Sequence, residues 1–288
     1  MQDEIVSRLA NTLNAQLIAA EARRAERSLH PDALDLYFQG RARWNKSWTP
    51  AHMTQARGFF GRALELDPEN VDALVGIGAV DVASATLLVI DDSDVRLAAA
   101  ETALRKALSL APQHALGHMY LGLVQLTSPR AAEGIAECEH AVALDRNLAE
   151  AHSAVGAAKL MVGRAEETEA HVQEALRLSP RDEGVNRWMS YVGLAKLHLG
   201  ADAEAVVWFR RSLKANSNYP FAYFELAAAL SLIGALDDAR AAAKEGLSLD
   251  PTFTIRRFKS VPFSGDPKFR AESRRILKGM RMAGVPEG

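Results

Sequence analysis

The sequence predicts an all-α protein in which helix pairs stack into a solenoid, and three observations support this prediction. A short phrase, Ala-Leu-x-Leu-Asp-Pro with variations, closes successive segments of the chain. The closing phrases follow one another at intervals of 34 residues in three cases, with one interval of 44 and one of 37. Alanine is abundant and aromatic residues make up only 7% of the chain, which suits closely packed helices. A unit of this length must stack on its neighbours to bury an apolar face.

Small and large apolar residues recur at fixed places inside each period. The first helix of a pair is expected to carry a small residue where it crosses the second, as at Gly40, Gly122, Gly156 and Ala227. The second helix carries a small residue opposite, at Ala100, Ala205 and Ala239. A larger apolar residue follows on that helix, and this set comprises Phe60, Leu104, Cys138, Val172 and Phe209. The closing phrases end at Pro68, Pro112, Arg146, Pro180, Ser217 and Pro251.

This pattern resembles the tetratricopeptide repeat (TPR), whose motif reads W-x2-L-G-x2-Y…A-x3-F…P. Residues 223–227 (Tyr-x2-Leu-Ala) and 205–209 (Ala-x3-Phe) match parts of it, whereas His118 and His152 stand in the Trp position. The resemblance covers residues 31–253. It implies a right-handed superhelix of about six helix pairs whose first helices line a concave wall.

Capping segments are expected at both ends of the array, because an open stack leaves apolar faces uncovered. Residues 1–30 are predicted to form an N-terminal linker or capping helix. Its apolar stripe is Ile5, Leu9, Leu13 and Leu17, with Val6 and Ile18 beside it. Residues 254–288 are predicted to form a basic C-terminal cap. This cap includes a loop over 251–265 and an amphipathic helix over 267–282 that carries Phe269, Ile276, Leu277 and Met280.

Within the array, local features place the individual helices. Thr49 and Pro50 predict the start of the second helix of the first pair. The long interval of 44 predicts an extended first helix over 71–90, and the acidic turn at 91–94 is interpreted as a helix start rather than a metal loop. Three extra residues are placed in the turn at 181–184, and the last pair is expected over 221–232 and 237–249.

Composition and charge exclude several classes of function. The net charge of -2 makes nucleic acid an unexpected partner, and no apolar run is long enough for a membrane span. The start lacks the pattern of a secretory signal, so a cytoplasmic location is expected. From residue 251 onward nine Lys/Arg face three acids, a local charge of +6. A solvated surface is the favoured interpretation, and an acidic partner or acidic upstream domain is the alternative.

No catalytic motif, cofactor site or metal site is predicted. The chain has no P-loop, no H-E-x-x-H and no nucleophile elbow. His114 and His118 have the i, i+4 spacing of a metal chelate, but interhelix hydrogen bonding is the favoured role. Cys138 falls on an apolar helix position and is expected to serve packing. The chain is therefore not expected to be an enzyme.

The predicted function is that of a scaffold which binds a protein or peptide in the concave groove. The number of residues between a first-helix position and the closing residue of its repeat predicts which side chains face the concave side of the array. They mix aromatic, aliphatic and Arg side chains, as binding grooves do. The predicted groove residues are Tyr37, Arg41, Trp44, Val75, Met119, Leu123, Ser153, Ala157, Arg187, Leu194, Phe221 and Phe224.

The two ends carry a second, finer resemblance. Residues 2–10 with 23–27, and residues 249–258 with 279–288, resemble the flanks of the repeat region in large rhizobial-type bacterial proteins. In that group the repeats follow a class III adenylate/guanylate cyclase domain, or a winged-helix domain with a TolB-like segment. This resemblance implies an alternative function, in which the chain is a regulatory C-terminal region acting on its own upstream domain. Any cyclase activity would then belong to that upstream domain.

Overall fold

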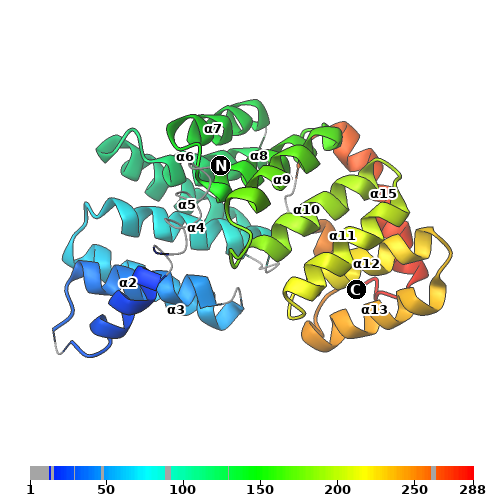
Figure 1. Ribbon diagram of the computed structural model, residues 1–288, viewed down its shortest axis with the longest axis horizontal. Helices are drawn as coiled ribbons and strands as arrows, with labels where there is room; N and C mark the ends of the chain where they lie inside the picture. Colours follow the sequence, from blue (N-terminus) through cyan, green and yellow to red (C-terminus); the bar gives the residue numbers. More distant parts are fainter. Residues whose placement is uncertain are drawn as a thin grey trace. The chain divides into compact units, whose positions relative to one another are not determined.

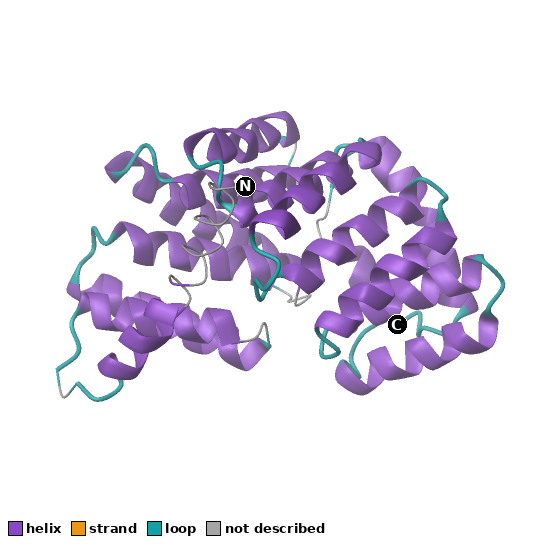
Figure 2. Cartoon of the chain, viewed as in Figure 1, coloured by secondary structure: helices purple, strands orange, loops and turns teal. Residues whose placement is uncertain are grey.

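The computed structural model describes residues 13, 16–28, 30–46, 49–87, 92–128, 130–260 and 264–288. All regular secondary structure in these residues is helical (Figure 2), which confirms the all-α prediction. The helices are α2 (Ala33–Lys46), α3 (Pro50–Leu66), α4 (Val71–Leu87), α5 (Ser93–Leu110), α6 (Ala115–Leu126), α7 (Ala131–Leu144), α8 (Ala149–Met161), a 3-10 turn η1 (Ala165–Glu167), α9 (Thr168–Leu178), α10 (Val185–His198), α11 (Asp202–Ala215), α12 (Pro220–Leu232), α13 (Leu236–Leu249), α14 (Ile255–Ser260) and α15 (Pro267–Met282).

Consecutive helices pack as adjacent pairs, from α2 with α3 to α12 with α13 (Figure 1). The pairs cross at Gly40 and Gly122, as predicted, and also at Gly193, which the sequence prediction did not include. An added Cβ would lie 2.5 Å from Phe60 at Gly40, 2.6 Å from the Cys138 Sγ at Gly122 and 2.6 Å from Phe209 at Gly193. Each of these partners is the large apolar residue that the sequence assigned to the second helix. The helix pairs therefore approach closely because one member has no side chain at the crossing.

Two recurrent turns connect the helices. The turn inside a pair ends the first helix with a glycine at positive φ, as at Gly163 (75°), Gly200 (76°) and Gly234 (85°). After each, a backbone N–H bonds back to the helix in the Schellman pattern, for example Ala201 N to Lys196 O at 2.9 Å.

The turn between pairs is held by the Asp or Asn of the closing phrase. The Oδ1 atoms of Asp145 and Asn216 each accept the backbone N–H two residues onward, at 2.9 Å. This side-chain turn does not require proline, which explains why Arg146 and Ser217 can replace it.

The contacts divide the chain into two compact units. Unit 1 comprises Met1–Gln125 with Ala132–Ala151, and unit 2 comprises Leu126–Ala131 with His152–Gly288. Each unit has its own buried aromatic residues, Phe60 in the first and Trp188 in the second. In unit 1, α4 is buried along nearly its whole length, as expected for a helix that is apolar all round.

The buried face of the N-terminal helix differs from the sequence prediction. Residues 16–25 are helical as expected, but their buried face is Ile18, Ala22 and Ala25. The predicted stripe is wrong here, because Leu13 and Leu17 are exposed by 61% and 53%. Ile5 and Leu9, also part of that stripe, lie outside the described residues.

The remaining boundaries follow the predictions, with one exception near the C-terminus. Thr49 caps α3 by accepting the His52 N–H, and α4 extends at least to Leu87, with the rest of the predicted 71–90 helix outside the described residues. The predicted loop over 251–265 contains a short helix, α14. No helix in the described part of the chain combines the length and apolarity needed to cross a bilayer.

Candidate functional site

In unit 2, the first helices α10 and α12 contact each other, and the surface that they form together is here called the unit 2 wall. It carries four of the predicted groove residues, Arg187 and Leu194 on α10 and Phe221 and Phe224 on α12. The C-terminal part of the chain returns onto this surface. Among the described helices, α15 packs mainly on α12 and also on α10 (Figure 1), so it does not simply cover the last helix, α13.

Aromatic stacking anchors the segment that leads into α14. The Phe253 ring lies parallel to that of Phe224, with centroids 3.7 Å apart and an interplanar angle of 10°. Phe253 also meets Phe221 edge-on at 5.9 Å, and Phe258 lies 6.3 Å from Phe221. Phe224 also packs on Gly246 of α13, and it has no exposed surface. The predicted groove anchors of α12 are thus covered by the protein's own chain.

Helix α15 covers the other half of the unit 2 wall with its apolar face. Phe269 packs with Leu160 and Leu194, and it stacks on the His198 ring at 4.5 Å. Farther along, Gly279 lies so close to α12 that an added Cβ would be 2.6 Å from the Ala228 carbonyl oxygen. The two helices therefore approach with backbone contact at this point.

Polar contacts fix α15 at its sides. The Arg275 guanidinium pairs with the Asp202 carboxylate in two places, one of them at 2.8 Å, and it also donates to the Leu197 carbonyl at 3.2 Å. His198 Nδ1 lies 3.0 Å from Glu272 Oε2. Burial lowers the pKa of His198, although the neighbouring Glu272 carboxylate acts in the opposite direction.

A buried carboxyl group lies between the two helices of the unit 2 wall. The side chain of Glu225 on α12 accepts a hydrogen bond of 3.0 Å from the Ser190 hydroxyl on α10. Burial raises the pKa of Glu225 to about 8, so the group is protonated at neutral pH. Glu225 was not among the predicted site residues, although a single Glu within the apolar sequence of α12 indicates a buried carboxyl group.

The first helices of unit 1 carry the other large groove residues. Trp44 on α2 is buried and meets Tyr120 on α6 edge-on at 6.3 Å. The Tyr120 hydroxyl donates to Glu150 at 2.8 Å. Tyr37, Arg41 and Leu123 are half-buried and reach the surface.

The burial of the predicted groove residues divides them into two groups. Tyr37, Arg41, Leu123, Arg187 and Leu194 are partly exposed. The others are buried in the cores of their own units, so in this conformation they offer little surface to a partner; they are Trp44, Val75, Met119, Ser153, Ala157, Phe221 and Phe224. Sequence offsets predict which way a residue points, but not what covers it.

The histidine and cysteine side chains have structural roles. His118 lies 2.6 Å from Glu137 Oε2 and 2.8 Å from the Pro112 carbonyl, so it joins neighbouring helices as predicted. Burial raises the pKa of Cys138 to about 12, which makes its thiol unreactive. The described residues contain no cluster of three or more His, Cys, Asp or Glu side chains that could hold a metal ion.

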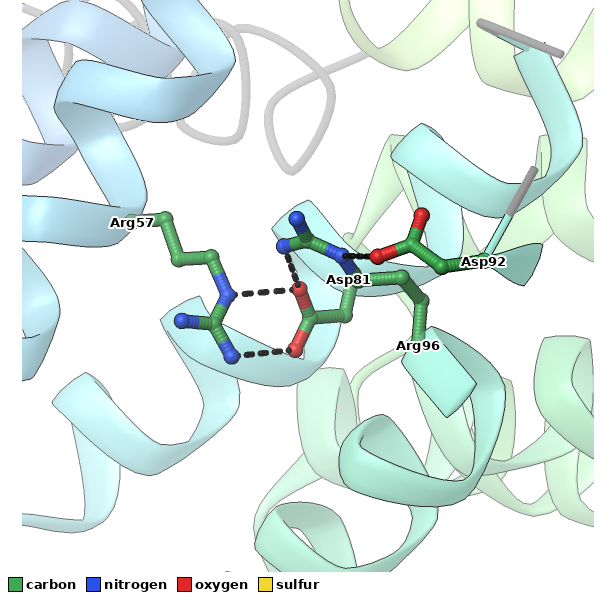
Figure 3. Close-up of polar contacts among 4 residues, drawn as sticks. All are labelled: Arg57, Asp81, Asp92 and Arg96. Atoms are coloured by element: carbon green, nitrogen blue, oxygen red, sulfur yellow. Dashed lines mark hydrogen bonds and ion pairs between the residues drawn. The ribbon is translucent and has the colours of Figure 1, made fainter. Parts of the chain in front are cut away.

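An ionic cluster around one buried carboxylate in unit 1 connects three helices (Figure 3). Asp81 on α4 has no exposed surface and accepts two hydrogen bonds from Arg57 of α3, at 2.7 and 3.1 Å. Arg96 of α5 donates to the same carboxylate at 3.1 Å and to Asp92 at 3.1 Å. Both oxygens of Asp81 are engaged, so this one carboxylate connects α3, α4 and α5.

Comparison with known proteins identifies the fold. No family model and no curated protein matches the chain. A thermophilic TPR protein of Thermus thermophilus is 16% identical, with 69% of this chain and 98% of that chain covered and a TM-score of 0.56. Cut9–Hcn1 of the APC/C is 16% identical, with 89% of this chain and 47% of that chain covered and a TM-score of 0.65. The human IFIT1 dimer with m7Gppp-AAAA is 18% identical, with 85% of this chain and 59% of that chain covered and a TM-score of 0.65. The chain therefore has the fold of tetratricopeptide-repeat proteins, an all-α solenoid of adjacent helix pairs.

Proposed function

We propose that the protein is a non-catalytic scaffold that binds a segment of another protein on the first-helix surface of its repeats. The observation that carries this proposal is the unit 2 wall, which already holds an amphipathic helix of the same chain through a close glycine contact and two side-chain pairs. A surface that accepts one helix in this way has the shape and polarity of a helix-binding groove. The single cysteine, Cys138, is free and buried, so the fold does not depend on a disulfide. A reducing compartment such as the cytoplasm suits such a protein.

A protein partner fits the charges better than a nucleic acid does. The solved structures of this fold include a protein assembly, Cut9–Hcn1, and the human IFIT1 dimer with m7Gppp-AAAA. The fold alone therefore does not decide between a protein and a nucleic acid as the partner. Binding of nucleic acid depends on a concentrated stripe of Lys and Arg. Here the net charge is -2, and the excess of basic residues gathers after residue 251 rather than on the first helices.

Site-specific photo-crosslinking tests the proposal in unit 1. A photoreactive amino acid replaces Leu123, a half-buried residue of first helix α6, in the full-length chain. The control position is Val95 on second helix α5, which is 69% exposed. We expect a protein adduct at Leu123 that is absent at Val95 and is lost in Tyr37→Ala. Equal adducts at both positions, or none at Leu123, would contradict the proposal.

The finer resemblance of the two ends favours a second candidate function, regulation of an upstream cyclase or DNA-binding domain in the same polypeptide. The residues that carry this resemblance include Phe253 and Gly279, which the fold also needs for packing. Sequence likeness at these positions thus has a structural explanation as well. Reading the gene upstream of Met1 separates the two. A reading frame that continues upstream into a cyclase or winged-helix domain supports regulation in cis, and an in-frame stop codon directly upstream of the Met1 codon contradicts it.

A further inference from the structure

We propose that α15 occupies in cis the partner site of unit 2, and that the partner is an amphipathic helix which presents the same contact face as α15. This inference rests on the proposed function and names its ligand class and its regulation. The contact face consists of an aromatic residue, an aliphatic residue seven positions later and a Gly-Met pair three positions after that, with an arginine just before the aliphatic residue. In α15 these are Phe269, Arg275, Ile276, Gly279 and Met280.

The apolar contacts define what the unit 2 wall selects. Phe269, Ile276 and Met280 are 7%, 2% and 0% exposed, so their side chains are nearly or completely buried. Gly279 is the strictest requirement, because any larger residue would collide with the backbone of Ala228. Helices that meet at a small residue exclude bulkier sequences at that point, which provides specificity.

The polar contacts add a requirement for charge. Asp202 is nearly buried and receives the Arg275 guanidinium, which also reaches the Leu197 carbonyl. On the other side, the buried His198 meets Glu272. A competing helix without the arginine would leave the Asp202 carboxylate unpaired, which costs binding free energy.

Helix α15 has the properties of a unit that can be exchanged. It has its own N-cap, since Asp266 Oδ1 accepts the Phe269 N–H at 2.9 Å, and its own C-terminal turn at Gly284 with φ of 82°. Its opposite face is exposed and basic, with Arg270, Arg274 and Lys278. The helix therefore contributes only one face to the core of unit 2.

The unperturbed chain keeps α15 in place. Beyond α15 the tail is tied to α14 by the Ile255 N–H to Pro286 and the Arg256 N–H to Glu287, at 2.8 and 2.9 Å. A tethered helix has an effective concentration on the order of millimolar, so a free helix of equal intrinsic affinity is excluded. The apparent affinity for a partner falls in proportion to the fraction of molecules in which the wall is open.

A synthetic, fluorescently labelled peptide of residues 264–288 provides the probe. It is titrated by fluorescence anisotropy into the full-length chain and into full-length Gly279→Leu, whose own α15 no longer fits against Ala228. We expect Gly279→Leu to bind the peptide at least about tenfold more tightly than the wild-type chain does. Gly265→Leu is the matched control, because no atom lies within 4 Å of an added Cβ there, and it should behave as wild type.

Several outcomes would overturn the inference. Equal peptide binding by the wild-type chain and the Gly279→Leu chain would mean that α15 does not block the site. A labelled peptide that itself carries Gly279→Leu and binds as tightly as the natural peptide would show that the site does not select for glycine. If Gly279→Leu loses its helical circular dichroism signal, the full-length Arg275→Ala variant replaces it in the titration. A peptide affinity of Arg275→Ala equal to that of wild type counts against the proposal. If light scattering gives the mass of a dimer for the wild-type chain and of a monomer for a chain with Gly279→Leu, the partner helix is α15 of a second copy instead. The adduct at Leu123 is scored separately, so the scaffold function can stand when this inference fails.

Discussion

Single residues set the distance between the helices of a pair, and Gly122 shows this most clearly. An added Cβ at this position would lie 2.6 Å from the Gly134 carbonyl oxygen and from the Cys138 Sγ. The carbonyl belongs to the backbone of α7, which cannot rotate away as a side chain can. We expect Gly122→Ala to lower the free energy of unfolding by about 1–3 kcal/mol, because the helices must separate.

Urea denaturation followed by circular dichroism measures this change. Gly58→Ala is the control, because Gly58 is an exposed position of α3 with no atom within 4 Å of an added Cβ. That substitution should raise stability by up to about 1 kcal/mol through helix propensity. A Gly122→Ala protein as stable as wild type would show that α6 and α7 do not meet at this glycine.

The carboxyl group of Glu225 predicts how stability depends on pH. Its pKa is about 8 in the folded chain, against 4.5 as the ordinary value. Between these values the folded state binds more protons than the unfolded state, so the free energy of unfolding falls as pH rises, by up to about 1.4 kcal/mol per pH unit. Glu225→Gln keeps a hydrogen-bonding partner for Ser190 but cannot ionise. Urea midpoints from pH 5 to 9 should therefore fall more steeply for wild type than for Glu225→Gln, and parallel curves would refute the assignment.

At the scale of elements, the Asp81 cluster joins α3, α4 and α5 through one buried carboxylate. Asp81→Ala removes the shared acceptor and leaves two arginines whose side chains are 40% and 32% exposed. Since these arginines can turn to water, we expect a loss of about 2–3 kcal/mol, below the usual cost of a broken buried pair.

Asp92 provides a matched comparison within the same cluster. Its side chain is 50% exposed and touches only Arg96 among the three other residues of Figure 3. Asp92→Ala should change stability by less than about 1 kcal/mol, as is usual for surface ion pairs. Thermal and urea unfolding of both variants would test the order, and an equal loss in the two would show that burial of Asp81 does not matter.

The helix pairs could be predicted from sequence because their determinants are local and periodic. The crossing glycines and the Asp and Asn turns recur from one period to the next, and the Thr49 cap is a local signal of Thr followed by Pro. Helix α14 escaped prediction because it is short, with six residues, and follows no repeat. The apolar face of α15 was predicted, but the pattern of one helix does not say which surface it will cover.

The candidate site was predictable only in part, for a related reason. The offsets placed Phe221 and Phe224 in the predicted groove, but the structure buries both side chains. Phe253, which stacks on Phe224, lies beyond the last closing phrase, where no period applies. Glu225 was overlooked because its importance depends on burial between α10 and α12, a property of two repeats rather than one.

At the scale of the whole molecule, charge is unevenly distributed along the chain. Residues 251–288 carry a net charge of +6, and the remainder carries -8. The segment that covers the unit 2 wall is thus opposite in charge to the rest of the protein. Attraction of this kind between partly exposed groups is screened by salt, with a Debye length of about 10 Å at 0.1 M and about 3 Å at 1 M.

Hydrogen exchange at different salt concentrations tests whether charge holds α15 on the wall. We expect backbone amides of α15 to exchange about two to five times faster in 1 M than in 0.05 M NaCl, because screening weakens the pair of Arg275 and Asp202. Helix α13 is the internal reference and should change little. Arg275→Ala should remove most of the salt dependence, since its guanidinium makes a direct ionic contact with Asp202 of α11. If α15 and α13 respond equally, apolar contacts alone retain α15, and a competing helix would then be selected by shape rather than by charge.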